Sequence, residues 1–180
     1  MTRQIALLRA VNVGGTRKIT SAELKSFLIE LGFKDAATLL NSGNVVFSAA
    51  KRTGAALEKH LAAEAKKRLG LDTDFLVRSA KEWRAIVDDN PFPKEARSDP
   101  GHLAVVALTG AADKKAVVAL GEANPGRERI VAAGTHLYVY YPDGVGQSKL
   151  TVQLMFRHLG VRATGRNWNT VLKLLALVGG

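Results

Sequence analysis

The chain has 180 residues, of which 47% are hydrophobic, so it can form one large or two small globular domains. It has no cysteine, which excludes disulfides, thiolate nucleophiles and zinc–thiolate sites. Apolar runs are shorter than the roughly 18 residues of a membrane span, and Arg9 interrupts the N-terminal run, unlike in a signal peptide. We therefore expect a cytoplasmic protein with no membrane partner. The net charge of +10 favours anionic partners, namely phosphate-bearing ligands, nucleic acid or an acidic protein.

The first half of the chain predicts the order strand, helix, strand, strand, helix, strand. Thr20 and Glu23 form a capping box at the start of the first helix, and Gly32 ends that helix. A further helix begins at Ser79 and stops before Pro91. The expected strands are 3–11, 36–41, 44–48 and 73–78, and the second helix is 54–69.

The second half repeats this order of elements without repeating the residues. Its expected strands are 102–109, 128–133, 136–141 and 161–165, and its expected helices are 113–120, 148–159 and 168–178. The segment between the halves is rich in proline and charge, as in a linker. We predict an α+β fold of two ferredoxin-like (β-α-β-β-α-β) units, each with an appended helix. The domains are 1–90, a linker at 91–101, and 102–180 with the C-terminal helix.

Both opening strands are continuously apolar, which predicts that both faces of each sheet are covered. The cover could be the other sheet, the appended helices or a partner chain, so the oligomeric state stays open. Tyr138 and Tyr140 share one face of a strand, where RNA-recognition domains of similar topology place stacking aromatics. The expected covering of the sheet weighs against that use.

Segments rich in asparagine and glycine occur at 9–15, 41–44 and 166–169. Together with the turn at 141–150 they form three corners that are candidate ligand sites. In this topology the end of the first strand lies close to the turn between the second and third strands. Backbone N–H groups, amides and an arginine would then share one edge, although a tight hairpin and a Gly-Gly loop would explain the same residues structurally. The candidate residues of this first corner are Arg9, Asn12, Gly14, Gly15, Asn41, Ser42, Gly43 and Asn44.

The second corner joins a strand to the helix expected at 148–159, and its candidate residues are Asp143, Gly144, Ser148 and Lys149. A helix N-terminus after glycines, with Lys149 in its first turn, suits a phosphate or carboxylate. The residue order differs from that of a phosphate-binding loop, which excludes nucleotide hydrolysis by this motif. Turn and cap chemistry is the alternative explanation.

The third corner precedes the last helix, and its candidate residues are Arg166, Asn167, Trp168 and Asn169. One of the two asparagines can cap that helix. The tryptophan can stack on a ligand or fill the core. No acidic residue follows Asp143, so the C-terminal segment is basic throughout.

These corners together resemble the bacterial domain-of-unknown-function family numbered 1697. The resemblance covers essentially the whole chain, and it departs from the family pattern at Ala10, where glycine is usual, and at Gly165, where alanine is usual. It implies a pair of ferredoxin-like subdomains and no assigned activity. The matching stretches are 7–15, 40–47, 90–93, 141–150 and 163–174.

We expect a protein that binds an anionic, phosphate-bearing ligand or nucleic acid in a cleft formed by the three corners. The alternatives are an enzyme acting on a small anionic substrate, with Asp143 or Ser148 near the chemistry, and a protein–protein adaptor with structural corners. The four histidines show no metal-ligand spacing. No proton-transfer pair is evident, so catalytic residues stay unassigned and no cofactor is expected.

Overall fold

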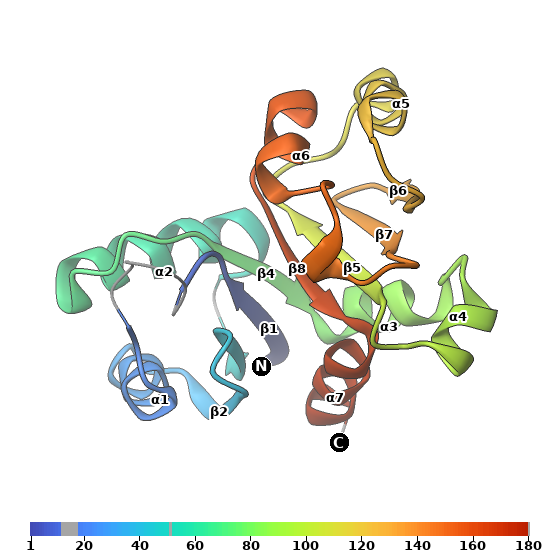
Figure 1. The fold of residues 1–180 in the computed structure, drawn as a ribbon. Helices are drawn as coiled ribbons and strands as arrows, with labels where there is room; N and C mark the ends of the chain where they lie inside the picture. The colour runs from blue at the N-terminus through green and yellow to red at the C-terminus, as the bar shows by residue number, and fades with distance from the viewer. Residues whose placement is uncertain (12–17, 51, 180) are drawn as a thin grey trace. The chain divides into compact units, whose positions relative to one another are not determined.

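The computed structural model describes residues 1–11, 18–50 and 52–179, which form two compact units (Figure 1). Unit 1 comprises Met1–Ile86 with Lys173–Gly180, and unit 2 comprises Val87–Leu172. The candidate residues Asn12, Gly14 and Gly15 lie outside the described residues. The domains expected from the sequence, 1–90 and 102–180, place the whole last helix in the second domain. In the structure the C-terminal half of this helix belongs to unit 1.

Unit 1 has one antiparallel sheet with the strand order β2-β3-β1-β4. The helices α1 and α2 share an apolar core with one face of this sheet, through Leu24, Phe27, Leu57 and Leu61. The predicted capping box is present, because Thr20 accepts from the N–H of Glu23 and Glu23 accepts from that of Thr20. The elements are β1 (Thr2–Leu8), α1 (Ser21–Glu30), β2 (Lys34–Leu39), β3 (Asn44–Ala49), α2 (Gly54–Leu69), β4 (Phe75–Ser79) and α3 (Ala80–Asp88).

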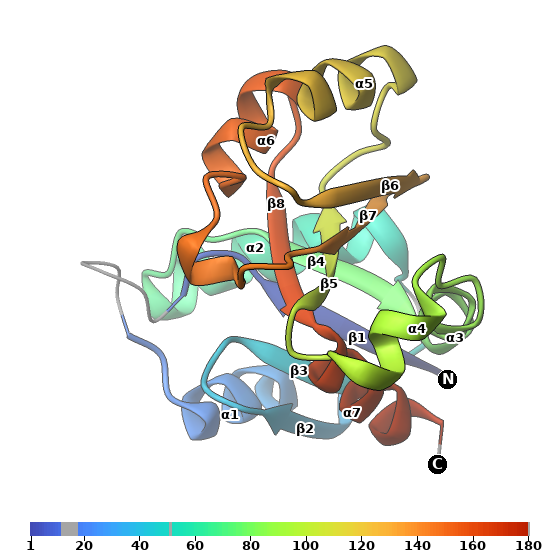
Figure 2. The same ribbon diagram turned by 45° about the vertical axis from the view of Figure 1, so that its right-hand side comes forward.

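Unit 2 repeats this topology with the strand order β6-β7-β5-β8. Figure 2 shows α5 and α6 together on one side of its sheet, where they share an apolar core with it. The elements are α4 (Pro93–Ser98), β5 (Leu103–Leu108), α5 (Lys114–Ala123), β6 (Arg129–Ala133), β7 (His136–Tyr140), the 3₁₀ turn η1 (Val145–Gln147), α6 (Val152–Leu159) and β8 (Ala163–Asn167). The last helix, α7 (Trp168–Val178), begins in unit 2 and continues into unit 1. The predicted α+β fold of two repeated units is confirmed.

Residues on both faces of the two opening strands are buried, as their continuous apolarity predicted. In β1, Ala6 and Leu8 face the helices, yet Ile5 and Leu7 on the other face are also fully buried. In β5 every residue is buried. Tyr138 is only 2% exposed, so its ring is not available for stacking on a base.

The segment expected to be a linker contains a helix packed within unit 2. Pro93 opens α4, at a position where a missing N–H costs no hydrogen bond. Phe92 before it is buried, and Glu95 forms an ion pair with Arg129 of β6. The proline and charges of 91–101 therefore cap and anchor a short helix instead of forming an extended connection.

Candidate functional site

Unit 2 contains a cavity of about 380 Å³ between its sheet and α6. The strand β5, the loop from Tyr141 to Thr151, α6 and the end of β8 all contribute to its walls. Its lining residues are Ala104, Val106, Tyr141, Val145, Ser148, Leu150, Thr151, Val152, Met155, Gly165, Arg166 and Asn167. The second and third predicted corners, which are distant in sequence, therefore meet at one cavity.

The missing side chain of Gly165 explains why the space is open. Ala104 and Val106 point to the helix-covered face of the sheet, and Gly165 lies opposite Val106 on the neighbouring strand. A Cβ atom at Gly165 would meet a Val106 methyl group at 3.6 Å, an ordinary contact. Because Gly165 has no side chain, β8 leaves the cavity next to this residue unfilled.

The loop that closes the cavity is held by hydrogen bonds between side chains and main chain. Ser148 donates to Glu128 and accepts from the N–H of Leu150, at 3.0 Å. Thr151, three residues later, accepts from the N–H of Leu154 and is the N-cap of α6. The prediction that the helix starts at Ser148 was wrong, because Ser148 is bound by Glu128, twenty residues away in sequence. Lys149 consequently lies in the loop before α6 and not in the first helical turn.

The titratable groups around the loop respond to burial and to each other. Burial opposes the ionisation of Glu128, but hydrogen bonds from Ser148, its own backbone and Asn124 lower the pKa of this carboxyl group below its usual value. Burial, reinforced by the negative Glu128, raises the pKa of Tyr141 to about 12. The loop therefore holds an ionised Glu128 beside a neutral Tyr141 at pH 7.

Asp143 forms a two-pronged ion pair with Arg127, and the hydrogen bond from this pair raises the pKa of Arg127 above its usual value. The pair joins the loop before β6 to the loop after β7. Gly144, the next residue, has φ +81°, a conformation that favours glycine. Asp143 and Gly144 are thus accounted for by the shape of the loop.

Arg166 contributes main chain, not charge, to the cavity. It alternates along β8 with Gly165 and Asn167, so its side chain lies on the opposite face of the sheet. There it donates to Thr164 and to the carbonyl of Gly165, each at 2.8 Å, and burial lowers its pKa to about 10.

The other residues of the third corner serve α7. Asn167 caps the helix by accepting from the N–H of Thr170 at 3.0 Å, one of the two predicted caps. Trp168 is 4% exposed, which agrees with the core alternative rather than with stacking on a ligand. Asn169 is exposed on the first turn of the helix.

In unit 1 the end of β1 lies beside the β2–β3 turn, as the topology predicted. The N–H of Leu8 donates to the carbonyl of Gly43 at 2.8 Å. Arg9 forms an ion pair with Asp74 at 2.6 Å. The amide of buried Asn44 donates within the turn to Leu39 and Ser42, each at 2.8 Å.

Of the candidate residues of this first corner that the structure describes, Asn41 and Ser42 are exposed. Asn41 lies 3.5 Å from the hydroxyl of Ser21. Unit 1 also contains a cavity, of about 210 Å³. It lies at the other end of β3, beside Ser48 and His60. The first corner belongs to unit 1, and the second and third corners belong to unit 2. That all three share one cleft stays a prediction.

Sequence reasoning missed a cluster of polar side chains around Asp99. The imidazole Nδ1 of His102 lies 3.0 Å from Asp99 Oδ2, and the hydroxyl of Tyr140 donates to the same oxygen at 2.9 Å. Arg129 lies over the Tyr140 ring at 5.0 Å. The signal was present as Asp99-Pro100-Gly101-His102, a turn sequence that brings its first and last residues together.

Within the described residues, no group of three or more His, Asp or Glu side chains is suited to hold a metal ion. In the same part of the chain, no helix has the length and apolarity needed to cross a bilayer. The cytoplasmic location expected from the sequence stays a prediction.

The two repeated β-α-β-β-α-β units define a duplicated ferredoxin-like α+β protein. The family described as "Protein of unknown function (DUF1697)" matches residues 1–138, and the chain belongs to this family. A solved structure, that of the conserved bacterial protein SP0830 from Streptococcus pneumoniae, has a similar fold with a TM-score of 0.75. It is 23% identical, and the match covers 98% of both chains. No curated protein matches the chain.

Proposed function

We propose that unit 2 binds a small organic anion whose apolar part enters the cavity beside Gly165. The observation that carries the proposal is the convergence of two corner segments on one largely apolar cavity. A volume of about 380 Å³ falls within the range of small-molecule sites. Apolar walls with a few placed polar groups are also typical of such sites.

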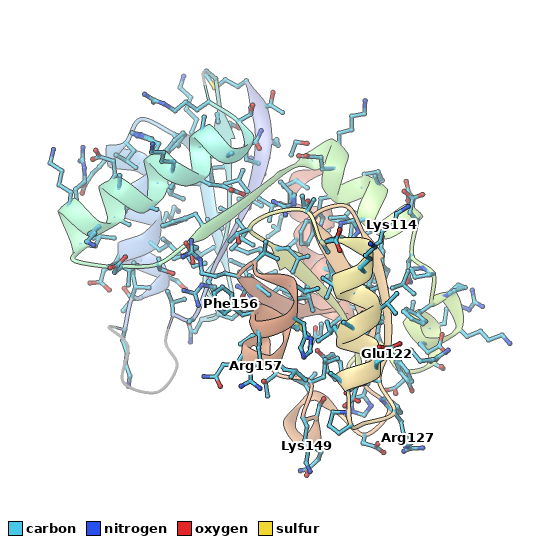
Figure 3. All side chains as sticks on the ribbon, turned by 90° about the horizontal axis from the view of Figure 1, so that it is seen from above. Lys114, Glu122, Arg127, Lys149, Phe156 and Arg157 are labelled. Carbon is cyan, nitrogen blue, oxygen red and sulfur yellow. The ribbon has the colours of Figure 1, made fainter. Side chains whose placement is uncertain are left out.

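The charge of the ligand follows from Lys149. Its neighbours Ser148 and Leu150 both line the cavity, and Lys149 itself is exposed. In Figure 3 its side chain extends outward from the loop. Among the described residues Lys149 forms no ion pair, whereas Asp143 is paired with Arg127. Glu128 is the nearby negative group, and Ser148 and Asn124 both bind it. The oxygens of Glu128 are thus occupied, and Lys149 is the exposed charged group beside the cavity that can pair with a ligand, which favours a carboxylate or phosphate.

A small anion fits these observations better than nucleic acid does. Single-stranded nucleic acid is held by a positively charged groove together with aromatic rings that stack on bases. Tyr138 is buried, and the ring of Tyr140 is covered by Arg129. The cavity instead offers a largely apolar space. An apolar chain that enters it gains roughly 25 cal/mol for each Å² of apolar area removed from water.

The test uses octanoate, 1-octanol and acetate as probes in thermal unfolding. Octanoate carries both the chain and the charge, so it should raise the melting temperature most, whereas acetate should have no effect. At about 100 times its dissociation constant octanoate should stabilise the fold by roughly 2.7 kcal/mol. Identical melting curves with octanoate and acetate would remove the proposal.

Two variants locate the site, each with a matched control. Gly165→Leu should fill the cavity and abolish the octanoate shift, while Gly121→Leu on α5, where a Cβ meets open space, should leave it intact. Lys149→Gln should weaken octanoate binding by several-fold and leave 1-octanol unaffected. Lys114→Gln removes an equal charge from the start of α5, which Figure 3 shows well away from Lys149, and should change neither. An equal loss in both lysine variants would contradict the placement of the anion.

A further inference from the structure

The turn at Asp99–His102 in unit 2 brings a carboxylate and an imidazole into direct contact. The N–H of His102 donates to the carbonyl of Asp99 at 3.1 Å and closes the turn, with proline and glycine at its centre. This geometry sets Nδ1 of His102 at 3.0 Å from Asp99 Oδ2. The backbone turn thus brings the two side chains within hydrogen-bonding distance of each other.

The partners of Asp99 define the tautomer of His102. Tyr140 donates to the same carboxylate oxygen, and this hydrogen bond raises the pKa of Tyr140, which stays a neutral donor at pH 7. An ionised carboxylate only accepts hydrogen bonds, so Nδ1 of a neutral His102 must carry the proton. The other ring nitrogen, Nε2, then has a free lone pair and can accept a proton.

The Nε2 atom faces the loop that closes the cavity. A Cβ atom at Gly144 would lie 3.3 Å from Nε2, so glycine leaves room beside this nitrogen. The adjacent Val145 lines the cavity, as does Tyr141, whose N–H donates to the carbonyl of His102 at 2.8 Å. The His102 side chain is 44% exposed, so water reaches it.

We propose that His102 is a general base for hydrolysis of an ester whose acyl chain occupies the cavity, and that Asp99 and Tyr140 position it. The inference rests on the proposed function, because the carboxylate product is the anion that the cavity binds. Nε2 takes a proton from water as the water oxygen bonds to the carbonyl carbon. The bond from that carbon to the leaving oxygen breaks, and the leaving alcohol recovers the proton from Nε2.

The other charged groups near His102 are already paired. Arg129 of β6 lies over Tyr140 and forms an ion pair with Glu95 of α4. Asp143, which precedes Gly144, is paired with Arg127. Asp99 is therefore the carboxylate in direct contact with the imidazole, and its negative charge favours the imidazolium formed as Nε2 takes up a proton.

The experiment measures hydrolysis of p-nitrophenyl octanoate and p-nitrophenyl acetate by the full chain across pH 5–9. The octanoate ester should react faster than the acetate ester, and the pH dependence of the rate reports on the general base. His102→Gln should lower the rate by about 100-fold, in the range for general bases. His60→Gln is the matched control, because His60 is similarly half-buried but belongs to unit 1, and it should leave the rate unchanged.

Asp99→Asn tests positioning, because it keeps the turn and removes the charge. It should lower the rate by about tenfold and shift the pH profile to lower pH, since the imidazolium loses its partner. Equal rates in the parent protein and His102→Gln would overturn the inference, as would equal losses in the His102 and His60 variants.

Octanoate binding to His102→Gln separates this inference from the function on which it rests. If octanoate raises the melting temperature but hydrolysis does not depend on His102, the inference fails and the binding proposal stands. If hydrolysis depends on His102 but octanoate never stabilises the fold, the binding proposal fails and the general base stands.

Discussion

The last strands of the two units, β4 and β8, share one arrangement and differ at the side chains that face the helices. The last-but-one residue of each is a buried arginine, Arg78 or Arg166, that donates to the carbonyl of the preceding residue. That preceding residue is Val77 in unit 1 and Gly165 in unit 2. Val77 is buried in the core of unit 1, whereas Gly165 is exposed to the cavity of unit 2.

The same contrast recurs two residues earlier and in the covering helix. Phe75 of β4 contacts the ring of Phe27, with ring centres 6.4 Å apart, whereas β8 has Ala163 at the matching position. The helix α2 has sixteen residues and α6 has eight. The space between the last strand and the helices is therefore filled at Phe75 and Val77 in unit 1 and open at Gly165 in unit 2, because unit 2 has smaller side chains and a shorter helix there. The candidate binding site therefore arises because unit 2 has smaller residues at these positions, and not because unit 2 has additional helices or strands.

Exchanging the two residues should break this contrast with the largest effect. Val77→Gly deletes a buried side chain from a strand, so it should lower the free energy of unfolding by about 4 kcal/mol. The reverse change, Gly165→Val, adds a side chain where ordinary contact distances remain, so it should alter stability by less than about 1 kcal/mol. Urea unfolding of both variants gives the two values. Similar losses in both would show that the two strands are packed alike.

Gly43 and Gly134 give a second matched pair, because they occupy the turns β2–β3 and β6–β7. Both have positive φ, +73° and +57°. A Cβ at Gly43 would lie 2.6 Å from Val11 and 2.8 Å from Leu8, whereas one at Gly134 meets nothing within 4 Å. Gly43→Ala should therefore cost about 3 kcal/mol and Gly134→Ala about 1 kcal/mol. Both costs are read from urea unfolding, and equal costs would mean that the first corner is not tightly packed.

The local signals in the sequence predicted the element order well. The capping box at Thr20 and the glycines Gly70 and Gly160 mark helix ends in the sequence, and the structure has αL glycines at both positions. These signals act over a few residues, so no knowledge of tertiary contacts is needed. The helix α4 within 91–101 was not predicted, although the proline of this segment opens the helix and Phe92 before it is buried.

The candidate site was harder to predict because its residues depend on distant partners. Ser148 was expected to start a helix, but Glu128 binds it. Arg166 was placed just beyond a strand at 161–165, whereas β8 extends to Asn167. The two-residue shift puts Arg166 inside the strand, where the alternation of side chains turns it away from the cavity. The Asp99–His102 contact was missed because its turn fell within the supposed linker.

Ionisation of the tyrosines should have the smallest effect on stability at neutral pH. At high pH it should lower the stability of unit 2 alone. Unit 2 contains all three tyrosines of the chain, and burial raises the pKa of both Tyr138 and Tyr141 to about 12. The unfolded value is about 10. Below pH 10 both states hold the phenolic proton and the contribution to stability is fully present. Between pH 10 and 12 the unfolded state ionises first, so the stability of unit 2 should fall.

Absorbance at 295 nm measures tyrosine ionisation directly. The folded protein should titrate at higher pH than the same protein in urea, and Tyr141→Phe should reduce the loss of stability between pH 10 and 12. Unit 1 has no tyrosine, so this source of pH dependence cannot act on it, and its unfolding at high pH should not respond to Tyr141→Phe. Coincident titrations of folded and unfolded protein would show that Tyr141 is open to solvent. The cavity wall that it forms would then be too loose to exclude water from a bound apolar chain.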